Sequence, residues 1–472
     1  MNRIPGSFRD PAGFVFEQNG KYFRLLTGKG IDQCDRLVQS GLYADLLEKN
    51  QILPFREEEI NSEMEKILSL ANGSFDPQSV RILELEKLDF VSYPCEWPFS
   101  LLKDAALLTL KIQKRALKYK MTLKDAVGYN IQFHRGTPVF IDHPSLEEYQ
   151  EGEPWKPYRQ FISHFLGPLL LMSRRDLRFR LDLQNHIEGL PLDYISKNLP
   201  ISSWFSPSCL LHIHGHAKMV ARYADRPMKN EPDYRKGSFS RRNLENLIDS
   251  LLNYVESIRP PKIKTEWADY YSNTNYTEGS FREKKRIVSE ISARLHPDTT
   301  IDLGANRGEF SRAAMNDSRI VLSPDIDPNA AEENYRAVRK NGEKNIYPFL
   351  LDLCNPTPGF GWANEERTGI LDRLHGDLVL ALALIHHLCI GNNVPLVSVA
   401  KLFRKMAPAL LLEFVPKTDS QTKKLLRARE DIFPDYQLDY CVKVFGKYYR
   451  DCQIIPLSES DRTLVFFQDS GY

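Results

Sequence analysis

Residues 300–311 read Thr-Ile-Asp-Leu-Gly-Ala-Asn-Arg-Gly-Glu-Phe-Ser, and this stretch decides the fold of the C-terminal part of the chain. Its apolar start suits a buried strand, Gly304 and Gly308 suit a tight turn, and Phe310 begins a pattern that can continue as a helix. The first amide groups of such a helix are unpaired and carry partial positive charge, so they favour a carboxylate or a phosphate. The segment therefore predicts a strand, a glycine turn and a helix that form a cofactor-binding loop.

The spacing of this loop separates it from a dinucleotide fingerprint. The NAD pattern is G-x-G-x-x-G, whereas here Gly304 and Gly308 are four residues apart and Asp302 lies two residues before the first of them. The loop resembles motif I of the class I S-adenosylmethionine-dependent methyltransferases, D/E-x-G-x-G-x-G, with Asn306 in place of the middle glycine. Asparagine visits left-handed backbone conformations, so the turn can survive this change. The resemblance implies that these four residues shape a site for S-adenosylmethionine.

The downstream sequence supplies further elements in the order that this family shows. Residues 319–326 predict a second strand that ends at Asp325, whose carboxylate can accept both ribose hydroxyls. Residues 345–353 predict a third strand, and Asp352 with Leu353 matches the family's position at the adenine edge. We therefore expect a doubly wound, Rossmann-like α/β methyltransferase sheet. Its other strands are predicted at residues 377–384, 409–415 and 462–468.

Two adjacent histidines follow the predicted central strand. By the same resemblance, His386 and His387 lie where the fourth strand opens onto the methyl group, so one of them could act as a base near neutral pH. The alternative is that they only pack or cap, because methyl transfer needs chiefly the alignment of the acceptor. The nitrogen-methylating motif Asn/Asp-Pro-Pro-Tyr/Phe does not follow this strand. An oxygen acceptor is slightly favoured for this reason.

Residues 379–388 and 411–419 extend the resemblance to the NoeA-like nodulation-related methyltransferases. These are two-part bacterial proteins in which a poorly understood N-terminal region precedes a class I methyltransferase domain. The resemblance implies S-adenosylmethionine as the cofactor. It leaves the methyl acceptor open, with a glycan, a lipid or a small metabolite as candidates.

The N-terminal half carries a different pattern at residues 123–142. Asp125 and Asn130 are spaced as in the kinase catalytic loop, and Asp142 stands where a kinase holds its magnesium-binding acid. However, no glycine-rich phosphate loop is visible near the N-terminus, and Arg24 stands at the place expected for the phosphate-binding lysine. The pattern predicts an α+β domain, with a kinase-like scaffold and a structural hairpin as the two interpretations. A phosphotransferase and a non-catalytic scaffold that only binds S-adenosylmethionine are the alternative functions.

The length of 472 residues exceeds what one core usually supports, so two or three units are expected. The prolines in residues 259–264 would stop the preceding helix and stiffen a join. The aromatic-rich residues 267–281 would form either a lid over the cofactor or a docking surface. We expect an N-terminal domain at 1–258, a linker and lid at 259–280, and a methyltransferase domain at 281–472.

Composition excludes several classes of protein. The 63 Lys and Arg residues nearly balance the 62 Asp and Glu residues, so no basic field recruits nucleic acid, and short basic runs such as 284–286 are expected on solvated helix faces. Seven scattered cysteines without a C-x-x-C pair, and no N-terminal apolar signal, point to the cytoplasm. No apolar stretch approaches the roughly 20 residues that span a bilayer. The oligomeric state stays open.

His212, His214 and His216 alternate along the sequence. On a strand they would share one face and could bind zinc, whereas on a helix they would spread around the axis. Because no nearby Cys or acidic residue completes a ligand set, we expect ordinary packing and no metal site.

Overall fold

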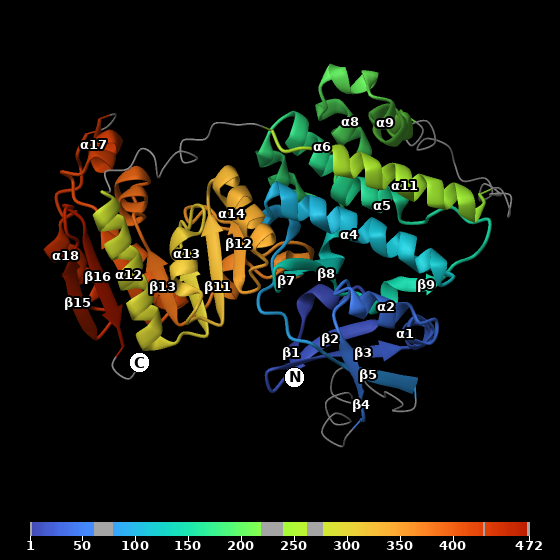
Figure 1. Ribbon diagram of the computed structural model, residues 1–472, viewed down its shortest axis with the longest axis horizontal. Coiled ribbons are helices and arrows are strands. Elements are labelled where there is room, and N and C mark those ends of the chain that lie inside the picture. The colour runs from blue at the N-terminus through green and yellow to red at the C-terminus, as the bar shows by residue number, and fades with distance from the viewer. Residues whose placement is uncertain (1, 61–78, 219–238, 262–276, 428–429, 470–472) are drawn as a thin grey trace. The chain divides into compact units, whose positions relative to one another are not determined.

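The computed structural model describes residues 2–60, 79–218, 239–261, 277–427 and 430–469 (Figure 1). Its contacts divide the chain into two compact units. The N-terminal unit comprises Met1–Lys262 with Phe360–Arg367, and the C-terminal unit comprises Ile263–Gly359 with Thr368–Tyr472. The predicted lid lies outside the described residues up to residue 276. Among the described residues, no helix combines the length and the apolarity that crossing a bilayer requires.

The N-terminal unit opens with an antiparallel sheet in the order β1-β2-β3-β5-β4. Strands β2 and β3 form a hairpin in which Gln18 pairs with Lys21. Between them, Asn19 and Gly20 have φ angles of 53° and 77°, as in the Asn-Gly turn that matches the twist of paired strands. The strands are β1 (Asn2–Arg3), β2 (Gly13–Gln18), β3 (Lys21–Thr27), β4 (Phe55–Glu58) and β5 (Val80–Leu85).

Helices and two two-stranded sheets, β6-β9 and the hairpin β7-β8, complete this unit. The long helix α4 (Phe99–Lys118) buries an apolar stripe, and α11 (Arg241–Ser257) packs along it after a cap at Ser240, whose hydroxyl accepts the Asn243 amide. The expected α+β character is present, and the kinase-like scaffold stays a prediction. The other elements are α1 (Lys29–Gln39), α2 (Leu42–Glu48), β6 (Met121–Leu123), β7 (Ile131–His134), β8 (Thr137–Phe140), β9 (Leu146–Glu148), α5 (Tyr158–Phe161), α6 (Gly167–Arg174), α7 (Asp182–Asn185), α8 (Leu192–Asn198), η8 (Ile201–Phe205), α9 (Pro207–Cys209) and η9 (Leu210–Gly215).

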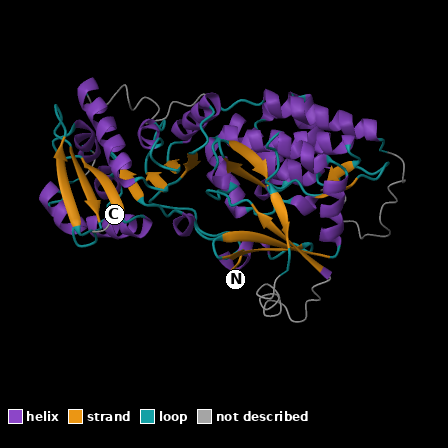
Figure 2. Ribbon diagram, turned by 60° about the horizontal axis from the view of Figure 1, so that its bottom comes forward, coloured by secondary structure: helices purple, strands orange, loops and turns teal. Residues whose placement is uncertain are grey.

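The C-terminal unit is built on a sheet in the order β12-β11-β10-β13-β14-β16-β15. Strands β10 to β14 are parallel, and β16 runs antiparallel to β14 and to β15. The chain enters the sheet at β10, adds β11 and β12 on one side, and then adds β13 and β14 on the other side. Right-handed connections in these two opposite directions place helices on both faces of the sheet (Figure 2). This is the predicted doubly wound sheet. Its strands are β10 (Thr299–Asp302), β11 (Ile320–Asp325), β12 (Ile346–Leu350), β13 (Leu378–Ala381), β14 (Ala409–Phe414), β15 (Asp451–Pro456) and β16 (Thr463–Gln468).

The helix after β11 begins at residue types that favour a helix start. Asp327 caps α14 (Pro328–Asn341) by accepting the Asn329 amide at 2.8 Å, and Pro328 occupies the first turn. The helix ends at Gly342, which has a φ of 66°. The other helices are α12 (Glu278–Leu295), α13 (Glu309–Ala314), α15 (Ile370–Arg373), η12 (His387–Gly391), α16 (Leu396–Met406), α17 (Ser420–Leu426) and α18 (Leu438–Phe445).

Candidate cofactor-binding site

The loop between β10 and α13 has the conformation that its sequence predicts. Gly304, Asn306 and Gly308 have φ angles of 72°, 51° and 78°, so all three are left-handed. The amides of Gly304 and Ala305 both donate to the carbonyl oxygen of Pro324, at 3.1 and 3.0 Å, which ties the loop to the end of β11. The loop therefore stands at the carboxyl end of β10, where the strand order reverses between β10 and β13. In open α/β sheets this is the place where ligands bind.

The two glycines are required for different reasons. A Cβ atom on Gly308 would lie 2.4 Å from Asn334 Oδ1 and 2.5 Å from Arg312 Nη1, so neighbouring side chains exclude it. A Cβ atom on Gly304 would meet only Leu384 Cδ1, at an ordinary 3.6 Å. The packing of neighbouring side chains therefore leaves no room for a side chain at Gly308, whereas there is space beside Gly304.

Asp325 lies at the carboxyl end of β11 and binds the loop directly. One carboxylate oxygen accepts the Asn306 amide and the other accepts the Asp327 amide, both at 2.7 Å. Burial raises the pKa of Asp325 to about 6, although these two amides oppose the shift. Each oxygen keeps a second lone pair, so the carboxylate can still accept a hydroxyl group.

Asp302 is turned toward the interior of the unit. Its carboxylate accepts the hydroxyl of Ser311 on α13 at 2.6 Å, and that hydroxyl also lies 2.8 Å from the hydroxyl of Ser323 on β11. Burial raises the pKa of Asp302 to about 6. Asp302 thus holds the first turn of α13 against the sheet, and this contact fixes the end of the loop that leads into α13.

The third predicted acid stands beyond the end of β12. The strand ends at Leu350, and Asp352 follows in a turn in which its side chain accepts the Cys354 amide at 2.8 Å. Asp352 and Leu353 are both half-buried. Strands β10, β11 and β12 are neighbours in the sheet and run parallel, so Asp302, Asp325 and Asp352 follow one another along the same edge.

The two histidines lie at the same edge, after β13. The strand is shorter than predicted because the chain turns at Ala383, which has a φ of 50°. His386 is fully buried, and among the described residues neither of its ring nitrogens has a hydrogen-bond partner. Burial, with His387 and Arg462 nearby, lowers the pKa of His386 well below its usual value, so the ring is neutral at neutral pH. The half-buried ring of His387 lies 4.0 Å from it, centroid to centroid.

A buried ionic network lies behind this edge, and the sequence did not indicate it. Lys284 on α12 was expected on a solvated helix face, but it is buried and bound to Glu413 on β14. Glu413 also lies 3.4 Å from Arg462, which binds Asp419 at 2.9 Å. The missed signal is the spacing of Lys284 from Ile287, which places the lysine on the apolar stripe of α12.

In the N-terminal unit, the residues of the kinase-like pattern do come together. Arg24 Nη1 lies 2.7 Å from Asp142 Oδ1, and Asn130 Nδ2 lies 3.4 Å from the other oxygen of that carboxylate. Ser145 bonds Asp142 and reaches Asp125 at 3.5 Å. Although burial opposes it, Arg24 holds the pKa of Asp142 below its ordinary value. Arg24 therefore already neutralises the acid that would bind magnesium.

His212 and His214 lie on η9, and His216 lies in the helical residues that follow it, so the strand alternative is wrong. His214 lies 2.8 Å from the hydroxyls of both Ser196 and Ser203, and His212 lies 2.7 Å from that of Tyr158. In the described parts of the chain, no group of three His, Cys, Asp or Glu side chains could hold a metal.

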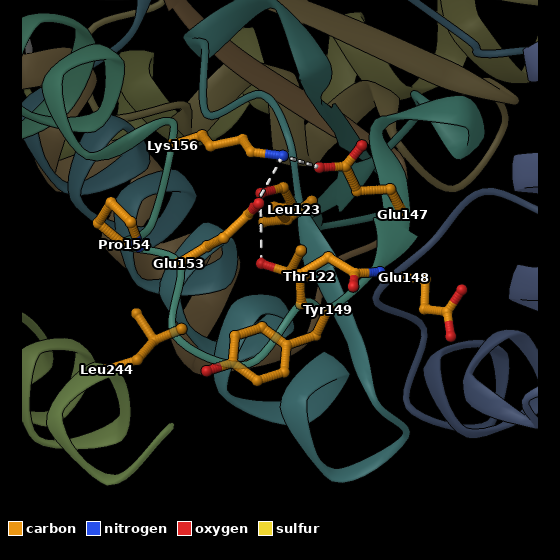
Figure 3. Close-up of a pocket in the computed structure, with 10 residues that line it drawn as sticks. Thr122, Leu123, Glu147, Glu148, Tyr149, Glu153, Pro154, Lys156 and Leu244 are labelled. Carbon is orange, nitrogen blue, oxygen red and sulfur yellow. Dashed lines mark hydrogen bonds and ion pairs between the residues drawn. The ribbon is translucent and has the colours of Figure 1, made fainter. Parts of the chain in front are cut away.

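A small surface pocket opens in the N-terminal unit near β6 and β9 (Figure 3). Lys156 stands in it between Glu147, at 3.1 Å, and Glu153, at 3.2 Å, and Thr122 and Tyr149 are among the other residues that line it. It contains no residue of either predicted site.

No family model matches the chain. The nodulation protein NoeA of Rhizobium meliloti (strain 1021) is 33% identical over 474 residues, which covers 99% of this chain and 96% of that protein. Among solved structures, N-methyltransferase NodS from Bradyrhizobium japonicum WM9 in complex with S-adenosyl-L-homocysteine is 10% identical and covers 44% of this chain and 100% of its own, with a TM-score of 0.30. Magnesium protoporphyrin IX methyltransferase from Synechocystis PCC 6803 is 16% identical and covers 40% of this chain and 84% of its own, with a TM-score of 0.27.

Proposed function

The chain belongs to the family of the nodulation protein NoeA, and we propose that it is an S-adenosylmethionine-dependent methyltransferase of the cytoplasm. The observation that supports this most is the left-handed loop of Gly304, Asn306 and Gly308 at the switch point of a doubly wound sheet. The loop follows the motif that class I methyltransferases use for this cofactor. Asp325 at the end of β11 and Asp352 just after β12 follow in the order that the same family shows.

The residues at this edge fit the parts of the cofactor. The space beside Gly304 lets the backbone approach a ligand closely. Asp325 would accept the ribose hydroxyls with its remaining lone pairs, and Asp352 would accept the exocyclic amine of adenine next to Leu353. When bound, S-adenosylmethionine supplies a methyl group on a sulfonium that is already a good leaving group. The protein's task is then to align the acceptor and to exclude water.

His386 is the proposed base, with His387 as the second candidate. The two ring nitrogens of His386 have no hydrogen-bond partner among the described residues, so the neutral ring has a lone pair that can accept the proton of an acceptor hydroxyl. The burial that lowers the pKa of His386 also makes it a weaker base, which opposes the assignment. The lone pair favours an oxygen acceptor on a glycan, a lipid or a small metabolite. His386→Ala should keep the affinity for S-adenosylhomocysteine and lose most methyl transfer in an acceptor screen with labelled cofactor. Equal turnover in the variant would remove the base assignment. If cofactor binds but no acceptor is methylated, the chain is a binding scaffold.

The test of the cofactor site is a calorimetric titration with S-adenosylhomocysteine. We expect a micromolar dissociation constant for the wild type, or about −8 kcal/mol, and no measurable binding for Asp325→Ala. Asp352→Ala should weaken binding without loosening the loop, because its carboxylate accepts only a local amide. Asp372→Ala is the matched control, since that exposed carboxylate pairs with Lys405 on the surface of the same unit. A folded wild type that gives no heat would contradict the proposal.

A second candidate function is phosphoryl transfer by the N-terminal unit. The convergence of Asp125, Asn130 and Asp142 favours it, because these are the residue types that orient a hydroxyl and chelate magnesium. The ion pair between Arg24 and Asp142 opposes it. Titration of the protein with ATP and magnesium tests this candidate. Binding that is lost in Asp142→Ala supports a nucleotide site in the N-terminal unit, and a titration without measurable binding heat contradicts it.

A further inference from the structure

The N-terminal unit exposes large apolar side chains on two adjacent helical turns. Ile201, Trp204 and Phe205 lie on η8, and Leu210 and Leu211 lie on η9, which packs against η8. Their exposed fractions range from 38% for Trp204 to 84% for Phe205. We call these five residues the apolar patch. Such a concentration on a soluble unit marks a surface that binds something.

The apolar patch is held rigidly in its exposed position. The buried ring of His214 lies 2.8 Å from the hydroxyl of Ser196 on α8 and 2.8 Å from that of Ser203 on η8. The ring of Trp204 stacks on His214 at 4.0 Å with an interplanar angle of 10°. Three elements are thereby fixed to one buried side chain. The exposure of Ile201 and Phe205 is consequently a property of the fold.

The charges that act on the His214 ring, on which Trp204 stacks, are the cations Lys218 and Arg174. Lys218 Nζ lies 4.7 Å above the Trp204 ring, and Lys197 on α8 is largely exposed. Arg175 donates to the last turn of α8 at the Asn198 carbonyl, 2.8 Å away. Against these cations, α8 carries Asp193, which pairs with Lys197. In Figure 1, α8 and α9 lie at the side of the unit that is remote from its β1–β5 sheet.

We propose that the apolar patch docks the protein onto an anionic membrane surface. Aromatic and aliphatic side chains on a short amphipathic element enter the boundary between headgroups and acyl chains. Tryptophan is favoured at that boundary, and lysine and arginine beside it meet the lipid phosphates. The cations beside the patch complement such a surface. The proposal is independent of the proposed methyl transfer, because it uses no residue of the cofactor site.

The test is co-sedimentation of the full chain with vesicles of phosphatidylglycerol and phosphatidylcholine in equal parts. The double variant Ile201→Ser, Phe205→Ser should bind about 100-fold more weakly, because it removes two exposed apolar anchors. Lys197→Gln with Lys218→Gln should cost about tenfold or more and reduce the sensitivity to salt. Ile432→Ser is the matched control, an apolar side chain of the C-terminal unit with 60% exposure, and it should bind as the wild type does.

The outcomes separate membrane docking from other uses of the patch. Wild-type protein that does not sediment with the mixed vesicles overturns the proposal. So does equal binding by wild type and the double variant. If the wild type is a dimer in solution and the double variant is a monomer, the patch is a contact between copies of the chain. Thermal melts of the variants must match the wild type, and unchanged titration with S-adenosylhomocysteine keeps this result apart from the cofactor site.

Discussion

At the scale of single residues, the candidate site depends on the carboxylate of Asp325, which holds the glycine loop by hydrogen bonds even without a ligand. Asp325 accepts amides on both sides, from Asn306 and from Asp327. A ligand at this edge would therefore meet a loop that is already closed. Such preorganisation lowers the conformational cost of binding. Because the loop is closed without a ligand, the effect of a glycine substitution on the free energy of unfolding can be measured separately from its effect on ligand binding.

Gly308 should be essential for folding of the loop. In Gly308→Ala the new methyl group would meet Asn334 and Arg312 while the backbone keeps a φ of 78°, so we expect a loss of about 2–4 kcal/mol in the free energy of unfolding. Gly342→Ala is the control, because its φ is 66° and nothing lies within 4 Å of the added carbon; about 1 kcal/mol is expected there. Urea unfolding measures both. Equal losses would show that the contacts around Gly308 contribute nothing.

Asp302 should make the stability of the C-terminal unit depend on pH. Its pKa is raised from 3.8 to about 6 by burial, so the folded state binds the proton more tightly than the unfolded state. The stabilising contribution is present below about pH 4 and is lost as the pH rises through 6. Asp302→Asn cannot titrate, and its amide oxygen still accepts from Ser311.

We therefore expect Asp302→Asn to gain on the order of 3 kcal/mol relative to the wild type between pH 4 and pH 7. The measurement is urea unfolding of both proteins, without cofactor, across that range. Subtracting the two curves cancels the titrating groups that do not interact with Asp302; Asp325, whose pKa the Asp302 charge helps to raise, leaves a smaller contribution in the difference. A stability difference that does not change with pH would contradict the raised pKa.

At the scale of the elements, α12 and β14 are joined by buried charge. Lys284 and Glu413 are both buried, and Glu413 also contacts Arg462. Removing one partner of such a pair leaves an uncompensated charge in the interior, whereas removing both can be almost neutral. The network thus adds little to the free energy of unfolding, but it requires α12 to pack with Lys284 next to Glu413.

Lys284→Met should therefore cost about 3–5 kcal/mol in the free energy of unfolding, and the double variant Lys284→Met, Glu413→Leu should cost less than the single one. Arg462 keeps Asp419 as its partner in the double variant. The neighbouring Lys285→Met is the control, because its pair with Glu309 is half-exposed and solvent-screened, and such pairs are worth at most about 1 kcal/mol. A double-mutant cycle measures the coupling. Additive losses would show that the two charges do not interact.

The elements also show what sequence can and cannot predict. The strand and glycine loop at residues 300–308 and the start of α14 at Asp327 follow from local rules of turn and cap chemistry, and both are present. Strand β15 was not predicted, because this edge strand is mostly exposed and has no apolar pattern. The burial of Lys284 and the isolation of His386 depend on neighbours that are distant in the chain. Tertiary contacts of this kind leave no short-range signal.

At the scale of the whole molecule, the chain consists of two compact units, each of which carries its own candidate chemistry. The C-terminal unit holds the loop and the acids of the proposed cofactor site, and the N-terminal unit holds the cluster around Asp142. A ligand that binds only the folded form of one unit stabilises that unit by mass action. Calorimetric unfolding can therefore assign each ligand to a unit without any assumption about how the units are arranged.

We expect two thermal transitions, of which S-adenosylhomocysteine raises only one. At 100 times the dissociation constant it should add about 2.7 kcal/mol, or a Tm increase of roughly 5–10 °C for a unit of this size. Asp325→Ala should abolish the increase. Asp142→Ala should lower the other transition, because among the acids that the structure describes it leaves the buried Arg24 with the weaker contact to Asp10, at 3.4 Å. If Asp142→Ala instead removed the effect of S-adenosylhomocysteine, the cofactor would bind in the N-terminal unit. A single transition that moves as a whole would show that the two units unfold together, and the assignment would then rest on the Asp325 titration alone.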